Sequence, residues 1–210
     1  MLDLILDDCM NVMKEYPDDH FNLAVVDPPY GLDKRLSSGG GDNKHTPFRV
    51  LYEEKVKSGQ NWDFKPGEDY WRELFRVSKN QIVCGANYFF DHLPSTRGIV
   101  AWDKLIFAPT MSRFELIWTS FDKPAALYEK ASKDLNRFHP TQKPVDLYRF
   151  LLDKFAEPGD IILDTHLGSG SIAIACHYLE LDLVGIEIDP EYFKKAEKRI
   201  IDETSQTTLF

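Results

Sequence analysis

"DIILDTHLGSGSIAIACHYLELDLVGIEI", residues 160–188, is the stretch that decides the fold. It predicts a strand over 160–164, a glycine-containing loop, a helix over 171–180 and a second strand over 183–188. Alternation of strands and helices is typical of a parallel sheet with helices on both faces. We therefore expect a single α/β domain with a doubly wound, mostly parallel sheet over residues 1–205.

The rest of the chain fits this architecture. "FNLAVVD" (21–27) is almost continuously apolar, as strands buried on both faces are. Residues 31–65 are rich in Gly, Ser and Lys and are expected to form a long flexible loop, and such loops are usually functional. Residues 121–138 are expected to be a short linker. The other expected elements are strands at 2–6, 81–84, 98–103 and 113–120 and helices at 9–16, 67–77, 86–92, 144–156 and 190–203.

Composition limits the class of protein. The chain has 210 residues, 43% of them hydrophobic, and a net charge of −9. No apolar run reaches membrane-spanning length, and the acidic N-terminus lacks the basic region of a signal peptide. The three cysteines are scattered, without the spacing of a disulfide framework or a metal site. We expect a cytoplasmic protein with no membrane partner and no metal; the family resemblance described below implies a bacterial or phage-infected cell.

The charge is unevenly distributed. Residues 31–49 carry four Lys or Arg and two acids, a local charge of +2, and residues 123–149 carry six and three, a local charge of +3. Two basic segments on an acidic body can follow the phosphates of a nucleic acid. Ordinary solvated loops would look the same, so charge alone leaves both interpretations open.

A glycine loop, Gly168-Ser169-Gly170, separates a predicted strand from a predicted helix. Such a loop lets the backbone approach a ligand closely and directs helix N–H groups toward it. The spacing also fits a dinucleotide site, with Glu187 on the ribose. However, Asp164 precedes the loop, and its charge would repel a pyrophosphate and attract a ligand with ammonium and sulfonium groups. This favours S-adenosylmethionine, whose ribose hydroxyls would donate to Glu187.

The tetrapeptide Asp27-Pro28-Pro29-Tyr30 follows a buried strand. Two prolines fix two φ angles and remove two backbone donors, which leaves a stiff, extended segment with free carbonyls. The exocyclic amine of a flipped-out base could donate to Asp27 and to the Pro28 carbonyl, while Tyr30 stacks on the base. The methyl group would then pass from sulfonium to nitrogen by direct displacement, with proximity and electrostatics supplying most of the catalysis. These four residues are the predicted catalytic set.

Together these motifs resemble the DNA amino-methyltransferases of the beta group, in which the catalytic motif precedes the cofactor loop. "DTHLGSGS" (164–171) resembles the family pattern D-P-F-x-G-S-G-T, and "HPTQKP" (139–144) resembles the family's upstream cofactor motif. "GIEIDPEYF" (185–193) resembles the ribose-binding strand, and "LDDCMNVM" (6–13) the segment whose acid reads the cofactor's adenine amine. The resemblance implies a sheet of the S-adenosylmethionine-dependent methyltransferase type and double-stranded DNA as substrate. An Asp at the first catalytic position implies adenine N6 as the target, because Ser is usual for cytosine N4.

The resemblance also implies the binding residues. The predicted cofactor set is Asp8, Cys9, Asp27, His139, Thr141, Lys143, Asp164, His166, Gly168, Ser169, Gly170, Ser171, Glu187 and Ile188. The loop 31–65 is expected to contact DNA phosphates, through Lys34, Arg35 and Lys44.

Two features depart from the family pattern. Thr165-His166 replace Pro-Phe, which we interpret as a tolerated aromatic exchange in which the imidazole stacks on the cofactor or titrates. The short linker 121–138 stands where the family has a target-recognition region. We therefore expect a short or loosely read target site, unless a homodimer or a separate recognition subunit helps.

The C-terminal tail, residues 206–210, carries Gln206-x-x-Leu209-Phe210. It resembles the short motif by which bacterial proteins bind the replication sliding clamp, with a glutamine for hydrogen bonding and two apolar anchors. Alternatively, Leu209 and Phe210 fold back onto the domain itself. Binding to the clamp would hold the enzyme on newly made DNA.

Three alternatives to an adenine-N6 DNA methyltransferase remain at this stage. The target could be cytosine N4 or an RNA base. The chain could be a non-catalytic cofactor-binding subunit, although such a subunit would not need Asp-Pro-Pro-Tyr. An NAD-dependent oxidoreductase is the third, and equilibrium binding of the two cofactors would separate it from the first two.

Overall fold

The computed structural model describes residues 1–31, 64–106, 112–131, 137–139 and 141–205. The strands are β1 (Leu2–Leu6), β2 (Phe21–Val26), β3 (Ser78–Cys84), β4 (Ile99–Asp103), β5 (Phe114–Thr119), β6 (Ala126–Glu129), β7 (Ile161–Asp164) and β8 (Asp182–Glu187). The helices are α1 (Cys9–Lys14), α4 (Glu68–Val77), α5 (Val145–Phe155), α6 (Ser171–Tyr178) and α7 (Pro190–Thr204), with a 3₁₀ turn, η1 (Ala86–Tyr88).

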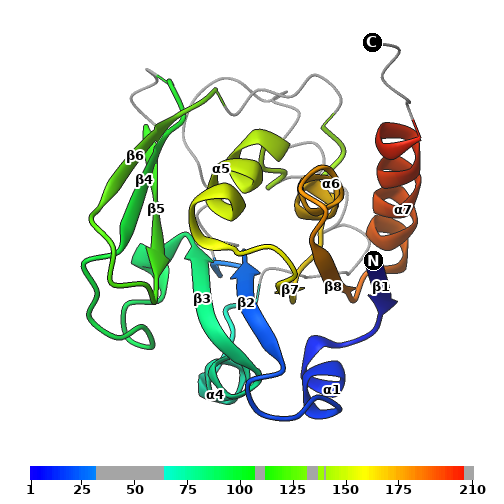
Figure 1. The fold of residues 1–210 in the computed structure, drawn as a ribbon, viewed down its shortest axis with the longest axis horizontal. Coiled ribbons are helices and arrows are strands. Elements are labelled where there is room, and N and C mark those ends of the chain that lie inside the picture. Colours follow the sequence, from blue (N-terminus) through cyan, green and yellow to red (C-terminus); the bar gives the residue numbers. More distant parts are fainter. Residues whose placement is uncertain (32–63, 107–111, 132–136, 140, 206–210) are drawn as a thin grey trace.

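These strands form a single sheet in the order β1-β8-β7-β2-β3-β5-β4-β6, with helices on both faces (Figure 1). The five strands from β1 to β3 in this order are parallel, β5 is antiparallel to its neighbours β3 and β4, and β6 is parallel to β4. The expected doubly wound, mostly parallel sheet is confirmed. Among the described helices, none has the length and apolar character needed to cross a membrane.

The strand order reverses between β2 and β7, which are hydrogen-bonded neighbours. From β2 the chain continues through α4 to β3, and from β7 it continues through α6 to β8 on the other side. Ligands of doubly wound sheets bind at such a reversal, beyond the carboxyl ends of the strands. The register pairs Ala24 with Leu163, so Asp27 and Asp164 emerge at the same edge.

Two apolar layers enclose the sheet. Helices α5, α6 and α7 cover one face, and α1 and α4 cover the other (Figure 1). Side chains of a strand alternate between faces, so Leu23 and Val25 pack under α5 and α6 while Ala24 and Val26 pack on the opposite face. All four side chains are essentially inaccessible to solvent. Burial on both faces explains why β2 has no polar alternation in its sequence.

Two expected elements differ from the structure. The expected linker 121–138 contains strand β6, whose Tyr128 ring stacks on Phe150 of α5 at a centroid distance of 4.5 Å. The indole N–H of Trp102 in β4 also donates to the carbonyl of Lys130 at 2.8 Å, which fixes the end of β6 against the sheet. The helix expected over 86–92 is only the short 3₁₀ turn η1.

Candidate functional site

A cavity of about 460 Å³ opens at the carboxyl ends of β2, β7 and β8. Its walls come from the Asp-Pro-Pro-Tyr segment, the glycine loop, the segment that leads into α5 and the β4–β5 region. Many predicted site residues line it: Asp27, Pro28, Pro29, Tyr30, His139, Thr141, Lys143, His166, Gly168, Ser169, Glu187 and Ile188.

Other predicted residues are not part of the cavity lining: Asp8, Cys9, Asp164, Gly170 and Ser171. Asp8 is the N-cap of α1, where its carboxylate accepts the Met10 N–H at 2.8 Å. The adjacent Cys9 is partly buried, and burial raises the pKa of its thiol to about 12. Gly170 precedes α6 with φ of 73°, and a Cβ there would lie 2.9 Å from Ile200 Cδ1, so only glycine fits without rearrangement.

The predicted DNA contacts and the tail motif lie outside the described residues: Lys34, Arg35, Lys44, Gln206, Leu209 and Phe210.

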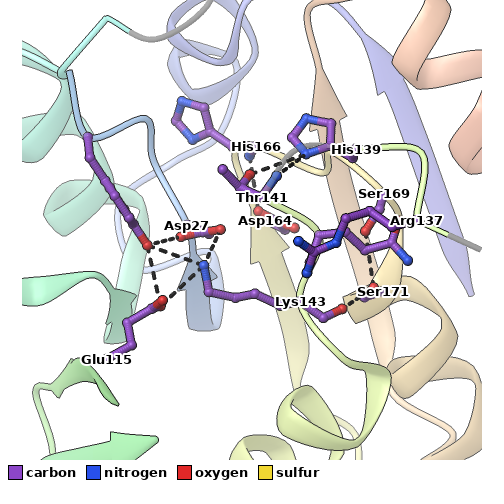
Figure 2. Close-up of polar contacts among 12 residues, drawn as sticks. Asp27, Glu115, Arg137, His139, Thr141, Lys143, Asp164, His166, Ser169 and Ser171 are labelled. Carbon is purple, nitrogen blue, oxygen red and sulfur yellow. Dashed lines mark hydrogen bonds and ion pairs between the residues drawn. The ribbon is translucent and has the colours of Figure 1, made fainter. Parts of the chain in front are cut away.

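A buried cluster of charges surrounds Asp27, the first residue of the predicted catalytic motif. The Lys143 ammonium lies 2.5 Å from Asp27 Oδ2 and 3.2 Å from Glu115 Oε1. The Tyr30 hydroxyl donates to Asp27 Oδ1 at 2.7 Å and accepts from Lys143 Nζ at 3.2 Å. Figure 2 shows the Asp27, Glu115 and Lys143 side chains converging from different elements. The Lys143 ammonium therefore engages the catalytic motif.

Electrostatics keep the Lys143 ammonium charged. Burial alone would lower the pKa of Lys143, but the Asp27 and Glu115 carboxylates more than offset it, and the pKa is raised above its ordinary value. The Cys84 thiol lies within 4.8 Å of both carboxylates, a spacing that could suit a metal ion. However, burial raises the pKa of Cys84 well above its usual range. With a neutral thiol and Lys143 paired to both carboxylates, these groups form an ion-pair cluster instead of a cation site.

Glu115 was not predicted from the sequence. It lies on β5, far along the chain from the catalytic motif. One sequence signal could have identified it, because it is the lone charged residue in the apolar strand "FELIWT". A charged side chain in such a strand is seldom buried without a partner.

The Tyr30 ring is held by aromatic neighbours. It stacks on Tyr88 with a centroid distance of 4.6 Å and an interplanar angle of 16°, and Phe89 contacts it edge-on. Gly85 permits this packing, because it has φ of 64° and a Cβ there would lie 2.3 Å from the Tyr30 ring. One face of Tyr30, which we expected to stack on a base, is therefore already covered by Tyr88. Tyr88 also lines the cavity and was missed in the sequence.

Two carboxylates are the last residues of the neighbouring strands β7 and β8, on the glycine-loop side. Glu187 accepts the Gly168 N–H at 2.8 Å and the Asp189 N–H at 2.9 Å, and the net effect of its burial is a raised pKa. Asp164 is buried, and its Oδ1 accepts the His166 N–H at 3.0 Å. No described group donates to Oδ2. Burial raises the pKa of Asp164 to about 8, so it carries a proton through much of the neutral range.

The Thr165-His166 departure has a structural explanation. The Thr165 hydroxyl lies 2.7 Å from the Tyr70 hydroxyl and 2.9 Å from His166 Nδ1, and the Tyr70 ring also packs edge-on against the imidazole. Burial lowers the pKa of His166 to about 4, so the ring is neutral near pH 7. Both contacts join groups that can donate or accept. If Tyr70 donates to Thr165 and Thr165 donates to Nδ1, the imidazole proton lies on Nε2.

His139 packs against the glycine loop. Its ring lies over Gly168, where a Cβ would come within 3.4 Å of the imidazole, and it packs edge-on against Tyr192 at 4.3 Å. Its Nδ1 is 3.2 Å from the Thr141 hydroxyl. Burial lowers the pKa of His139 to about 4. Both cavity histidines are thus neutral near pH 7.

Comparison with known proteins adds sequence relatives. A family model described as a DNA methylase of the N6/N4 type matches residues 43–198. The chain is 24% identical over 95% of its length to the type II methyltransferase M.HpaI of Haemophilus parainfluenzae, covering 74% of that protein. It is 26% identical over 92% of its length to YubD of Escherichia coli K12, provisionally named a methylase, covering 87% of it.

Solved structures share the fold. A provisionally assigned DNA modification methylase of Thermus thermophilus, crystallised with S-adenosylmethionine, superimposes with a TM-score of 0.64 at 16% identity, covering 99% of this chain and 98% of that one. M1.HpyAVI, also crystallised with S-adenosylmethionine, gives 0.58 at 20% identity over 95% and 100% of the two chains. The cytosine-N4-specific PvuII DNA methyltransferase gives 0.64 at 14% identity over 98% and 92%.

Proposed function

This chain belongs to the N6/N4 family of DNA methylases, and we propose that it transfers the methyl group of S-adenosylmethionine to N6 of an adenine flipped out of DNA. One observation carries the choice of base: a carboxylate, Asp27, occupies the first position of the catalytic motif and lines the cavity. Within the part of the chain that the structure describes, each Asp27 oxygen has one donor, Tyr30 on Oδ1 and Lys143 on Oδ2. A carboxylate has about four acceptor sites, so it retains capacity for an amine N–H.

The residues around the glycine loop suit the proposed cofactor. Glu187 would accept the ribose hydroxyls, giving up backbone N–H groups that it otherwise accepts. Asp164 would pair with the α-ammonium through Oδ2, and the neutral His166 and His139 rings would pack on either side of the ligand. When bound, S-adenosylmethionine supplies an electrophilic methyl group attached to a sulfonium.

The catalytic motif would hold the target amine. Asp27 and the Pro28 carbonyl accept its two N–H groups, so the nitrogen lone pair can point toward the methyl group. The rigid Pro28-Pro29 backbone fixes the acceptors before the base arrives, which is how preorganised dipoles lower a barrier. After transfer the nitrogen carries a positive charge, and loss of one N–H proton to the carboxylate or to water restores a neutral base.

The test is methylation of unmodified DNA with radiolabelled S-adenosylmethionine, followed by identification of the modified base. We expect N6-methyladenine. Asp27→Ala should lower kcat by roughly 10²–10³-fold or more while cofactor binding, measured by calorimetry, is largely kept. Asp153→Ala, the same change on the exposed side of α5, is the matched control. N4-methylcytosine as the product would overturn the choice of base, and an unaffected rate in Asp27→Ala would overturn the assignment of the motif.

Two partner proposals rest on the sequence alone. The loop 31–65 would contact DNA phosphates, so deleting residues 37–43 should weaken DNA binding without changing cofactor binding. The tail motif at 206–210 would bind a sliding clamp. A labelled 201–210 peptide should then bind the clamp with micromolar affinity, and Leu209→Ala/Phe210→Ala should abolish it. The absence of binding by both peptide and whole protein would refute the clamp proposal.

A further inference from the structure

We propose that Glu115 and Lys143 act with Asp27 as one charge-balanced unit of the methyl-transfer site, an inference that rests on the proposed function. In this unit the Lys143 ammonium bridges the two carboxylates. Glu115 supplies a second negative charge beside the target amine. Both would be positioning residues that act through Asp27.

The geometry around Lys143 satisfies its ammonium completely. A lysine has three N–H donors, and three oxygens lie within 3.2 Å of Nζ, one each from Asp27, Glu115 and Tyr30. The Lys143 side chain is 4% exposed and each carboxylate side chain 13%. Removing one partner of such a buried ion pair strongly destabilises a protein, because the other charge is left buried without compensation. The arrangement is therefore built around the charges of all three groups.

The bridge also connects the two halves of the site. The carbonyl of Lys143 accepts the Ser171 hydroxyl at 2.7 Å, at the start of α6 just after the glycine loop (Figure 2). Arg199 of α7 donates to the same hydroxyl at 2.9 Å. The Lys143 backbone is thus fixed to the cofactor loop, and its side chain is fixed to the catalytic motif. The spacing between the two motifs depends on this residue.

Charge balance explains why two carboxylates are needed. Asp27, Glu115 and Lys143 sum to a charge of −1. Methyl transfer moves positive charge from the sulfonium to the amine nitrogen, next to Asp27. A site with net negative charge stabilises that nitrogen, whereas Asp27 neutralised by Lys143 alone would not. Burial raises the pKa of both Tyr30 and Cys84 and keeps these two neighbours neutral. Lys104 at the cavity wall also faces Glu115, and burial lowers its pKa, while Asp164 and His139 are further titratable neighbours. The sum of −1 counts the three directly paired charges alone.

The experiment compares Glu115→Gln, Lys143→Met and the double variant. Glu115→Gln keeps the shape but removes the charge, and we expect kcat to fall by about 10- to 100-fold with the Kd for S-adenosylmethionine changed less than about threefold. Glu129→Gln, the same change at an exposed position of β6, should match the wild type. Lys143→Met leaves two carboxylates close together, so one will hold a proton near pH 7 and kcat should rise with pH toward the alkaline range.

The double variant is the decisive arm. Glu115→Gln/Lys143→Met restores a net charge of −1, so its kcat at pH 7 should exceed that of Lys143→Met by at least about tenfold, with a pH profile like the wild type's. A purely structural role predicts the opposite, a double variant no better than the worse single one. If Lys143→Met does not fold, Glu115→Gln alone still decides. An active wild type with an unchanged Glu115→Gln rate overturns this inference, whereas an inactive wild type overturns the proposed function.

Discussion

Replacing Asp164 with asparagine should remove a proton linkage from cofactor binding. Burial raises the pKa of Asp164 to about 8, so at pH 7 about ten in eleven cofactor-free molecules carry a proton on this carboxyl. Pairing with the α-ammonium of S-adenosylmethionine requires the ionised form. Binding must therefore release a proton, and affinity should increase as the pH rises toward 8.

The size of the effect follows from that pKa. For a single group, the apparent Kd scales with one plus the ratio of protonated to ionised carboxyl. Kd should fall about ninefold from pH 6 to 7 and about 2.6-fold more by pH 7.5. His139 and His166, with pKa values lowered to about 4, stay neutral across this range and contribute nothing to the slope. The cofactor's own α-amino group has an ordinary pKa of about 8, so it loses its proton as the pH approaches and passes 8, which ends the useful window.

The sign for stability is opposite to that for binding. A carboxyl whose pKa is raised on folding makes the folded state bind more protons than the unfolded state. Asp164 therefore stabilises the cofactor-free protein fully below about pH 4, its unfolded-state pKa, and this contribution is lost as the pH rises through about 8. Asp164→Asn should flatten that decline in the free energy of unfolding, which urea titrations at several pH values would measure.

Calorimetry in two buffers with different ionisation enthalpies measures the linkage directly. At pH 7 the wild type should release close to one proton per cofactor bound, about 0.9 from the pKa above. Asp164→Asn should bind more weakly, with a Kd that does not vary between pH 6 and 7.5 and with no proton release. A flat wild-type Kd over this range would refute the reasoning, and so would an equal slope in Asp164→Asn.

Two further substitutions test how the cavity walls are held. Gly85→Ala places a methyl group 2.3 Å from the Tyr30 ring at a positive φ. We therefore expect urea titration to show a loss of about 1–3 kcal/mol in the free energy of unfolding, and methylation kinetics to show a kcat reduced more than cofactor affinity. An unperturbed kcat would contradict this expectation. Tyr70→Phe removes the O–H at the start of the hydrogen-bond chain to His166, so cofactor affinity should drop about fivefold, or about 1 kcal/mol. Nitrogen NMR of the imidazole should show that the preference for the Nε2–H tautomer is lost in this variant. An Nδ1–H tautomer in the wild type would disprove the proposed direction of the chain.

The parallel half of the fold could be predicted because its signals are local. Residues 160–204 pass twice from a short apolar strand to a helix, and each strand ends at an acid or a glycine loop. Strand β6 was not predicted, because it has only four residues and places only two side chains on each face of the sheet. Its Leu127 is 63% exposed, so hydrophobicity does not mark it as part of a core. Only the pairing with β4, remote in sequence, defines this strand.

The residues of the site also divide into those that local sequence motifs predict and those that only the folded structure brings together. Motifs that are contiguous in sequence located the cavity-lining residues of the glycine loop and of the Asp-Pro-Pro-Tyr tetrapeptide. Glu115, Tyr70 and Tyr88 reach the site from β5, α4 and η1, so their roles depend on distances that the sheet order alone determines. Lys143 shows most clearly what the sequence could not predict. The motif "HPTQKP" places the residue at the site, but it does not tell whether the ammonium contacts the glycine loop or the Asp-Pro-Pro-Tyr segment.

The exchange of Pro-Phe for Thr165-His166 is best understood as one change with two parts. A neutral imidazole in a buried wall needs a partner for Nδ1, and the Thr165 hydroxyl provides it at 2.9 Å, which a proline at this position could not do. The Thr165 hydroxyl is itself buried, and its second partner is the Tyr70 hydroxyl of α4 at 2.7 Å. Each polar group introduced at the glycine loop is therefore satisfied by the next. With Tyr70 as the first donor, the chain would end on His166 Nε2–H, and this residue of the cavity wall could then donate to an acceptor atom of the ligand without adding a charge near Asp164.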